Sequence, residues 1–349
     1  MKLQHLLLVF LLSSCSTTIK NLDLYQKQFL SRTEFMPSSE RLDGKAPKIV
    51  VFPLDENDNP TAKQSQLGNS IANNVENILA KHRLAELVDR NAATKLQKEI
   101  ALAEMHNTGS YKGPKVADYA VSGTIANADF SSKFVSGTTY INPKNFQVIS
   151  LPPRFIYNSN VAGNIKIYEL PSLTVIEAIE FEGKRARTEN VQQKGGVSIG
   201  MLQIGGEKVK GVERDDGLVR RAGQDAVEEV EIAIKNAFAK TGYILEKRVN
   251  GSKTIFKINL GSMDGIKQND KFEVIGKYEV ENPISNETET ERRIIATGTV
   301  SDIIDPKTCF VIINDEKKAN TIRLGDMIKM KYEKSRFKSF LKWVGRLME

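Results

Sequence analysis

The stretch Lys48-Ile49-Val50-Val51-Phe52-Pro53-Leu54 is the first strongly patterned run in this sequence of 349 residues. Its unbroken apolar side chains, ended by a proline, predict a buried strand. Apolar residues at helical spacing then predict a helix over residues 67–79, and a short strand follows at 85–88. A second helix is expected to run to about Met105, and residues 119–125 form the next strand. Strands that alternate with helices predict a layered α/β domain.

The rest of this domain is expected to contain a hairpin, a closing helix and two insertions. Residues 164–170 alternate with period two and lead into a Pro-Ser turn, and a long helix is predicted over 217–240. Residues 130–160 are poor in charge and rich in small polar and aromatic side chains, whereas 184–213 is rich in glycine. We therefore assign residues 47–245 to one α/β domain with insertions at these two places.

The predicted secondary structure changes to short strands towards the C-terminus. Residues 253–332 contain several short alternating strands separated by glycine turns, which predict a small all-β barrel domain over 246–333. The expected fold class is α+β: a three-layer-like α/β domain with two β-hairpin insertions, followed by the barrel. Cys309 lies in an apolar strand-like run, so its thiol is expected to be buried and inert. Residues 334–349 form a basic amphipathic tail that fits a membrane surface, or that packs on its own domain or frays.

The first 14 residues have the pattern of a secretory signal peptide. A positively charged start precedes an unbroken apolar run at residues 6–12, which is too short to span a bilayer stably. Cys15 directly follows Leu-Ser-Ser, an order that resembles a bacterial lipoprotein signal and implies cleavage before Cys15 and acylation of its thiol. Ser16, in place of Asp, implies sorting to the outer membrane. The alternative is an ordinary signal peptide that contains a cysteine. Residues 15–46 are polar and are expected to be a lipidated tether.

The amino-acid composition of the chain limits the kinds of partner that it is expected to bind. The chain is 40% hydrophobic and 27% charged, which is typical of a globular protein. The formal net charge is +7, but basic and acidic residues are interspersed, so no nucleic-acid partner is expected. After the signal peptide no segment approaches 18 consecutive apolar residues, and no transmembrane helix is predicted.

No catalytic, cofactor-binding or metal-binding residues are predicted, and an enzyme is not expected. His82 and His106 lack the spacing of a metal-binding pair. The glycines at 195–206 lack the Gly-Lys-Ser/Thr that completes a phosphate-binding loop. Asp215-Asp216 precedes the long helix and is expected to cap it and to compensate its dipole. An envelope enzyme is the third and least favoured class.

The order of these motifs over residues 15–242 resembles the curli secretion channel family of CsgG-like lipoproteins. The segments that carry the resemblance are the lipidated cysteine, Ile49-Val50-Val51-Phe52-Pro53, Leu87-Val88-Asp89-Arg90, Ala117-Asp118-Tyr119-Ala120-Val121-Ser122-Gly123-Thr124-Ile125 and Pro171-Ser172. The same core is similar to LpoB-like lipoprotein activators of penicillin-binding proteins. Residues 253–332 are similar to the C-terminal barrel of the flagellar assembly protein FlgT, whereas curli channels end without such a domain.

The resemblance implies a role for the two insertions. In the channel family each insertion becomes a β-hairpin, and the subunits share one barrel through the outer membrane. Apolar and polar residues should then alternate, with the apolar side towards lipid. The candidate membrane-hairpin residues are Phe134, Tyr140, Phe146, Val148, Val197, Ile199 and Met201. The other interpretation leaves both insertions as loops on a periplasmic domain.

The leading hypothesis is an outer-membrane lipoprotein, anchored through acylated Cys15 and facing the periplasm, that forms an oligomeric ring or pore. It would serve curli-type secretion or the assembly of an extracellular or envelope structure, with no cofactor. The expected partners are outer-membrane lipid, further copies of the chain, and a secreted protein substrate or an envelope protein. The alternative is a monomeric periplasmic lipoprotein adaptor that regulates an envelope enzyme or a flagellar or cell-wall machine.

Overall fold

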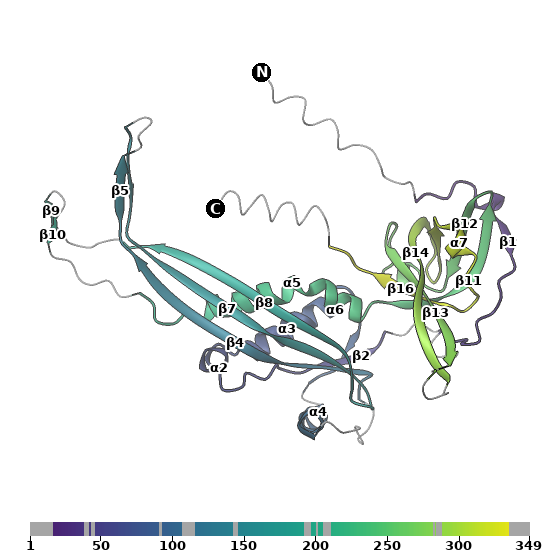
Figure 1. Ribbon diagram of the computed structural model, residues 1–349, viewed down its shortest axis with the longest axis horizontal. Helices are drawn as coiled ribbons and strands as arrows, with labels where there is room; N and C mark the ends of the chain where they lie inside the picture. Colours follow the sequence, from purple (N-terminus) through teal and green to yellow (C-terminus); the bar gives the residue numbers. More distant parts are fainter. Residues whose placement is uncertain are drawn as a thin grey trace. The chain divides into compact units, whose positions relative to one another are not determined.

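The computed structural model divides into two compact units, residues 47–237 and residues 1–46 with 238–349 (Figure 1). We call them the α/β unit and the barrel unit. The structure describes residues 17–37, 42, 46–90, 93–106, 116–141, 146–191, 197–199, 202–204, 211–281, 283 and 288–334. In these residues no helix is both long and apolar enough to cross a membrane. The α+β fold class predicted from the sequence is confirmed, including the small barrel.

The α/β unit is built on a sheet of five strands in the order β3-β2-β4-β7-β8. The strands are β2 (Lys48–Val51), β3 (Glu86–Leu87), β4 (Tyr119–Val135), β7 (Arg154–Glu169) and β8 (Thr174–Asn190). Strand β2 pairs in parallel with β3 and β4, whereas β4, β7 and β8 are antiparallel to one another. Ile49, Val50 and Val51 are fully buried because β2 lies in the interior of the sheet.

Helices cover both faces of this sheet and complete the three layers (Figure 1). The helices are α2 (Pro60–Ser65), α3 (Leu67–Lys81), α4 (Thr94–His106), α5 (Asp216–Glu229) and α6 (Glu231–Ala237). Leu96 and Ile100 of α4 pack against Val50 and Phe52 on one face. Helices α3 and α5 pack on the other face and against each other.

Two helix predictions differ from the structure. The predicted helix 67–79 is preceded by a separate helix, α2, which begins where the Asn59 side chain accepts a hydrogen bond from Ala62 N at 2.9 Å. The predicted single helix 217–240 is two helices, because the backbone leaves helical geometry at Val230. Its apolar spacing continued across this break, so the pattern alone did not reveal it.

The two insertions are shorter than predicted. The first hairpin consists of β5 (Thr138–Ile141) and β6 (Val148–Leu151), and the second of β9 (Val197–Ile199) and β10 (Leu202–Ile204). Within the predicted insertion 130–160, residues 130–135 belong to β4 and residues 154–160 to β7, and β8 extends into the predicted insertion 184–213 as far as Asn190. The sheet therefore continues well past the helices α3 and α4, and each hairpin is confined to a few residues.

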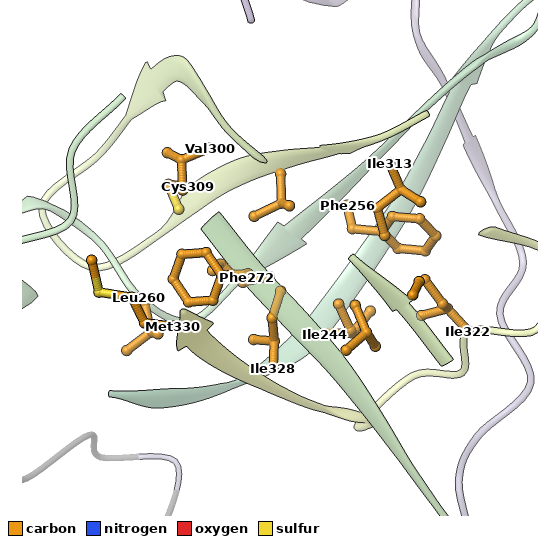
Figure 2. Packing of buried hydrophobic residues seen from close by; sticks show 14 of the residues in the cluster. Ile244, Phe256, Leu260, Phe272, Val300, Cys309, Ile313, Ile322, Ile328 and Met330 are labelled. Carbon is orange, nitrogen blue, oxygen red and sulfur yellow. The ribbon is translucent and has the colours of Figure 1, made fainter. Parts of the chain in front are cut away.

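The barrel unit is a closed barrel of six strands in the order β11-β12-β15-β14-β13-β16, with β16 pairing back onto β11. The strands are β11 (Thr241–Asn250), β12 (Lys253–Ile258), β13 (Lys271–Glu281), β14 (Thr288–Ile304), β15 (Cys309–Ile313) and β16 (Met327–Lys331). Phe256 and Phe272 are fully buried at its centre, beside Ile244 and Ile328 (Figure 2). The first strand begins at Thr241, five residues before the predicted start of this domain.

The prediction that residues 15–46 form a tether is wrong for the part that the structure describes. Ile19 and Tyr25 are buried in a small cluster with Ile255 and Phe310. A short 3-10 helix, η1 (Leu22–Leu24), precedes strand β1 (Gln26–Gln28), which pairs with β11. Residues 17–37 are polar overall, so the few buried apolar side chains did not stand out in the sequence. We call residues 17–28 the N-terminal strap.

Gly183 allows α5 to approach β8 closely. A Cβ atom at this position would overlap the carbonyl oxygen of Ala222 and lie 2.5 Å from Ala226 N. We expect Gly183→Ala to lower the free energy of unfolding by about 1–3 kcal/mol, since backbone atoms cannot move aside. Urea denaturation followed by circular dichroism measures this change. Gly217→Ala, whose Cβ would meet only side-chain atoms of Asp215 and Arg221, is the control, and equal losses in both variants would contradict the interpretation.

Cys309 is buried in the barrel core, as predicted, with 1% of its surface exposed. Burial disfavours the thiolate and raises the pKa of Cys309 to about 12. In a Cys15→Ser variant, we therefore expect Cys309 to resist iodoacetamide in the native state and to react fully in concentrated guanidinium chloride. Mass spectrometry of the alkylated protein measures the outcome. Rapid alkylation without denaturant would show that the thiol is accessible.

Candidate functional site

Strands β4, β7 and β8 reach the same end of the sheet, and both hairpins leave from there (Figure 1). Val135, the last residue of β4, pairs with Arg154, the first residue of β7, and Arg154 also pairs with Asn190 at the end of β8. We call residues 128–135, 154–161 and 184–190 the distal end. The first hairpin follows Val135, and the second lies in the connection after Asn190.

One face of the distal end carries an aromatic cluster that is buried at its centre and exposed at Phe134, which has 52% of its surface exposed. Phe155 and Tyr157 are buried together with Leu218 at the start of α5. The Phe130 and Tyr157 rings stack with centroids 6.0 Å apart, and the Phe134 and Phe155 centroids are 5.2 Å apart. These side chains share a face because residues two apart along a strand point the same way. The cluster therefore holds the distal end against the first turn of α5.

Arg187 connects this cluster to the cap of α5. Its guanidinium lies 4.9 Å from the centroid of the Tyr157 ring, and its Nη2 lies 3.1 Å from Asp215 Oδ2. The other oxygen of Asp215 accepts a hydrogen bond from Leu218 N at 2.9 Å. The prediction that Asp215 caps this helix is confirmed. One arginine thus bridges an edge strand, an aromatic ring and a helix terminus.

Asp216 has a different partner. Arg214 Nε donates a hydrogen bond to Asp216 Oδ1 at 2.6 Å, and this bond lowers the pKa of the Asp216 carboxyl. Asp216 also lies in the first turn of α5, where a negative charge compensates the helix dipole. Both aspartates therefore have structural partners at the start of α5.

The opposite face of the distal end is polar and open. Ser131 and Lys133 of β4, Asn158 of β7, and Lys184 and Thr188 of β8 are exposed and share this face of the sheet. The candidate residue Phe134 of β4 pairs with Phe155 of β7 and contacts its ring, so it lies in the long β4–β7 ladder and precedes the short hairpin of β5 and β6.

The first hairpin exposes apolar side chains on both faces. Tyr140 pairs with Ile149 and Ile141 pairs with Val148, so Tyr140 and Val148 lie on opposite faces. Phe146, in the connection, is 81% exposed and Val148 is 63% exposed. The expectation of one apolar face is not met here. Between residues 134 and 153 the sequence has one charged residue, Lys144. The hairpin is thus an apolar projection with almost no charge.

The second hairpin has the alternation that the sequence analysis sought. Val197 pairs with Ile204 and Ile199 pairs with Leu202, so these four backbone positions share one face. Ser198 and Gln203 pair on the other face. Met201 lies outside the described residues. The sequence analysis missed Leu202 and Ile204, because the alternation resumes there shifted by one residue relative to Val197 and Ile199.

His82 and Cys15 are further residues that the sequence analysis considered. Among the described residues, no group of three or more His, Cys, Asp and Glu side chains is placed to hold a metal ion. His82 Nε2 lies 3.2 Å from Glu231 Oε1 between α3 and α6, and burial lowers the pKa of His82. Cys15, the predicted acylation site, lies outside the part of the chain that the structure describes.

Comparisons with known proteins give little further guidance. No protein-family model and no curated protein matches this sequence. Among solved structures, a PelC variant from Paraburkholderia phytofirmans, described as a dodecamer, is 12% identical. The match covers 59% of this chain and 94% of that chain with a TM-score of 0.23.

The Arg187 bridge can be tested against a neighbouring arginine. Arg187→Ala should lower the free energy of unfolding by about 1–2 kcal/mol, since it removes a partly buried ion pair and a cation–π contact. Arg185 pairs with Asp225 at 3.0 Å in a more exposed place, so Arg185→Ala should cost less than about 1 kcal/mol. Urea denaturation of both variants measures the difference. Equal costs would mean that Arg187 does not hold the distal end.

Proposed function

We propose that this protein is a lipid-anchored outer-membrane protein that assembles into a homo-oligomeric ring through which a protein substrate passes. The observation that carries the proposal is that both apolar hairpins leave the same end of the sheet. In a ring of identical copies, every subunit would then contribute its two hairpins to a common wall around the axis.

Exposed apolar surface supports an assembly role. Tyr140, Ile141, Phe146 and Val148 are each at least half exposed on one short hairpin. Contiguous exposed apolar side chains on a monomer mark a site that another surface covers. Hairpins of neighbouring copies would cover one another and line the passage, whereas the polar face of the distal end would stay in water.

The anchor in this proposal comes from the sequence. Acylated Cys15 would hold each subunit on the periplasmic face of the outer membrane, with lipid as a permanent partner. The proposed activity is transport by binding and assembly, with no catalytic step, cofactor or nucleic acid.

A second candidate function is that of a monomeric periplasmic adaptor. The shortness of the hairpin strands favours this function. Strands β5 and β6 have four residues each, and β9 and β10 have three. A strand that crosses a bilayer needs about 9–11 residues. The apolar hairpins would then bind an envelope enzyme or machine directly.

Polar substitutions in the first hairpin distinguish these functions. We expect the double variant Ile141→Asn and Val148→Asn to abolish rings, because paired exposed apolar side chains would no longer be covered by a neighbouring copy. Electron microscopy of the full-length lipidated protein, extracted in mild detergent, measures ring formation. Circular dichroism should be unchanged because both side chains are exposed.

The matched control carries Leu24→Asn and Leu102→Asn, two exposed leucines far from the hairpins in the sequence. Rings in the wild type and the control, but not in the hairpin variant, would support the proposal. Uniform monomers in the wild type would overturn the ring and support the adaptor. Rings in the hairpin variant would show that this hairpin does not form the contact.

A further inference from the structure

We infer that residues 211–215, which we call the crossing segment, couple the second hairpin to the root of the first hairpin. The crossing segment follows the second hairpin in the chain and leads into α5, and it contacts all three strands of the distal end. A displacement of the second hairpin is then transmitted to the strands from which the first hairpin leaves. The inference deepens the proposed function and rests on it for the role of the coupling in ring assembly.

The crossing segment begins on strands β4 and β7. Gly211 lies directly against Ser132 of β4 and Phe155 of β7, because a Cβ atom at Gly211 would lie 2.7 Å from both Ser132 Oγ and Phe155 Cε1. The Phe155 side chain is buried, with 8% of its surface exposed, so its ring cannot turn aside into water. Gly211 therefore allows the backbone of the crossing segment to contact two strands at once.

The next contacts of the crossing segment lie on β7 and β8. Val212 N donates a hydrogen bond to Tyr157 Oη at 3.3 Å. Three residues later, Asp215 Oδ2 lies 3.1 Å from Arg187 Nη2 on β8, the edge strand of the sheet. The crossing segment therefore runs from β4 over β7 to β8 before α5 begins at Asp216.

The chain that leads into the second hairpin is fixed at the same place. Val191, directly after β8, packs against the aromatic cluster. Its backbone N–H donates a hydrogen bond to Pro153 O at 2.8 Å, and Pro153 directly precedes the first residue of β7. The chain therefore leaves for the second hairpin at Val191 and returns from it at Gly211, and both places contact the start of β7 or the aromatic cluster.

The root of the first hairpin contacts the same ring as the crossing segment. Phe134, near the end of β4, has its ring centroid 5.2 Å from the centroid of Phe155. Val135 follows it and pairs with Arg154 at the start of β7, so these residues lie where the first hairpin leaves and returns. Phe155 is therefore in contact with the root of the first hairpin and with Gly211 of the crossing segment.

Close packing makes these contacts act together. Tyr157 is 2% exposed, and its ring centroid lies 6.0 Å from the centroids of both Phe130 and Phe155. In a close-packed cluster one side chain cannot move far unless its neighbours move as well. When a neighbouring copy displaces the second hairpin, the crossing segment would therefore shift these rings and, through them, the root of the first hairpin.

Hydrogen exchange, measured by mass spectrometry on the full-length protein in mild detergent, tests the coupling. Gly211→Ala should push the crossing segment away from Phe155. We expect amide exchange in residues 130–135 and 154–158 to become about fivefold faster, the ratio that corresponds to the loss of one typical hydrogen bond. These residues lie on β4 and β7, far from the substitution in the sequence, so faster exchange there reports transmission through the cluster.

A second variant and a matched control complete the comparison. Tyr157→Phe removes only the acceptor of the Val212 hydrogen bond and keeps the ring. It should speed exchange in residues 211–215 and 130–135 by about twofold to fivefold. Val212→Ala shortens a side chain of the crossing segment that is 41% exposed and leaves its backbone contacts in place, so exchange in the same residues should not change.

Electron microscopy of the same preparations relates the coupling to assembly. Fewer rings in Gly211→Ala than in Val212→Ala, together with faster exchange in both strand segments, would support the inference. Faster exchange confined to residues 211–215 in Gly211→Ala and Tyr157→Phe would overturn the coupling, and undiminished rings with faster exchange in the strands would overturn its role in assembly. Monomers in the wild type would overturn the proposed ring, whereas the exchange rates would still decide whether the crossing segment couples the hairpins.

Discussion

The continuous antiparallel register of β4, β7 and β8 is the constraint on which the α/β unit depends. Pairing runs from Tyr119 and Glu169 to Val135 and Arg154, and β8 follows β7 over the same length. Side chains alternate between the two faces of the sheet. A shift of one residue in the register would therefore move the aromatic side chains to the polar, water-exposed face. The same register fixes the level at which the strands end, and therefore the place where both hairpins begin.

A second pairing constraint explains the N-terminal strap. Strand β11 has ten residues, and β16 pairs with only its first three, Thr241–Tyr243. The edge at Lys247–Val249 would otherwise present unpaired backbone groups, and β1 pairs with it there. The barrel edge is therefore covered by a segment from the far end of the sequence, residues 26–28.

The sequence predicted elements well where a single pattern persisted. The run at 48–54 contains a buried strand, the helix near 67–79 is present, and Cys309 is buried in a barrel strand. It predicted the distal end poorly. Residues 130–135 and 154–160 were assigned to an insertion, but they continue β4 and β7 with an aromatic face and a polar face. Phe134 and Tyr140 are both aromatic residues in the same alternating run of the sequence. In the structure Phe134 packs on the Phe155 ring, whereas Tyr140 lies on the first hairpin.

The sequence by itself determined the fold class and the two apolar segments that became hairpins, because composition and periodicity are local properties, and the acylation of Cys15 stays a prediction from the sequence. Only the tertiary structure decided that both hairpins leave one end of the sheet, that Arg187 bridges Tyr157 and Asp215, and that residues 17–28 pack on the barrel. Each of these depends on contacts between residues far apart in the chain, and no local pattern encodes which distant partner a side chain meets.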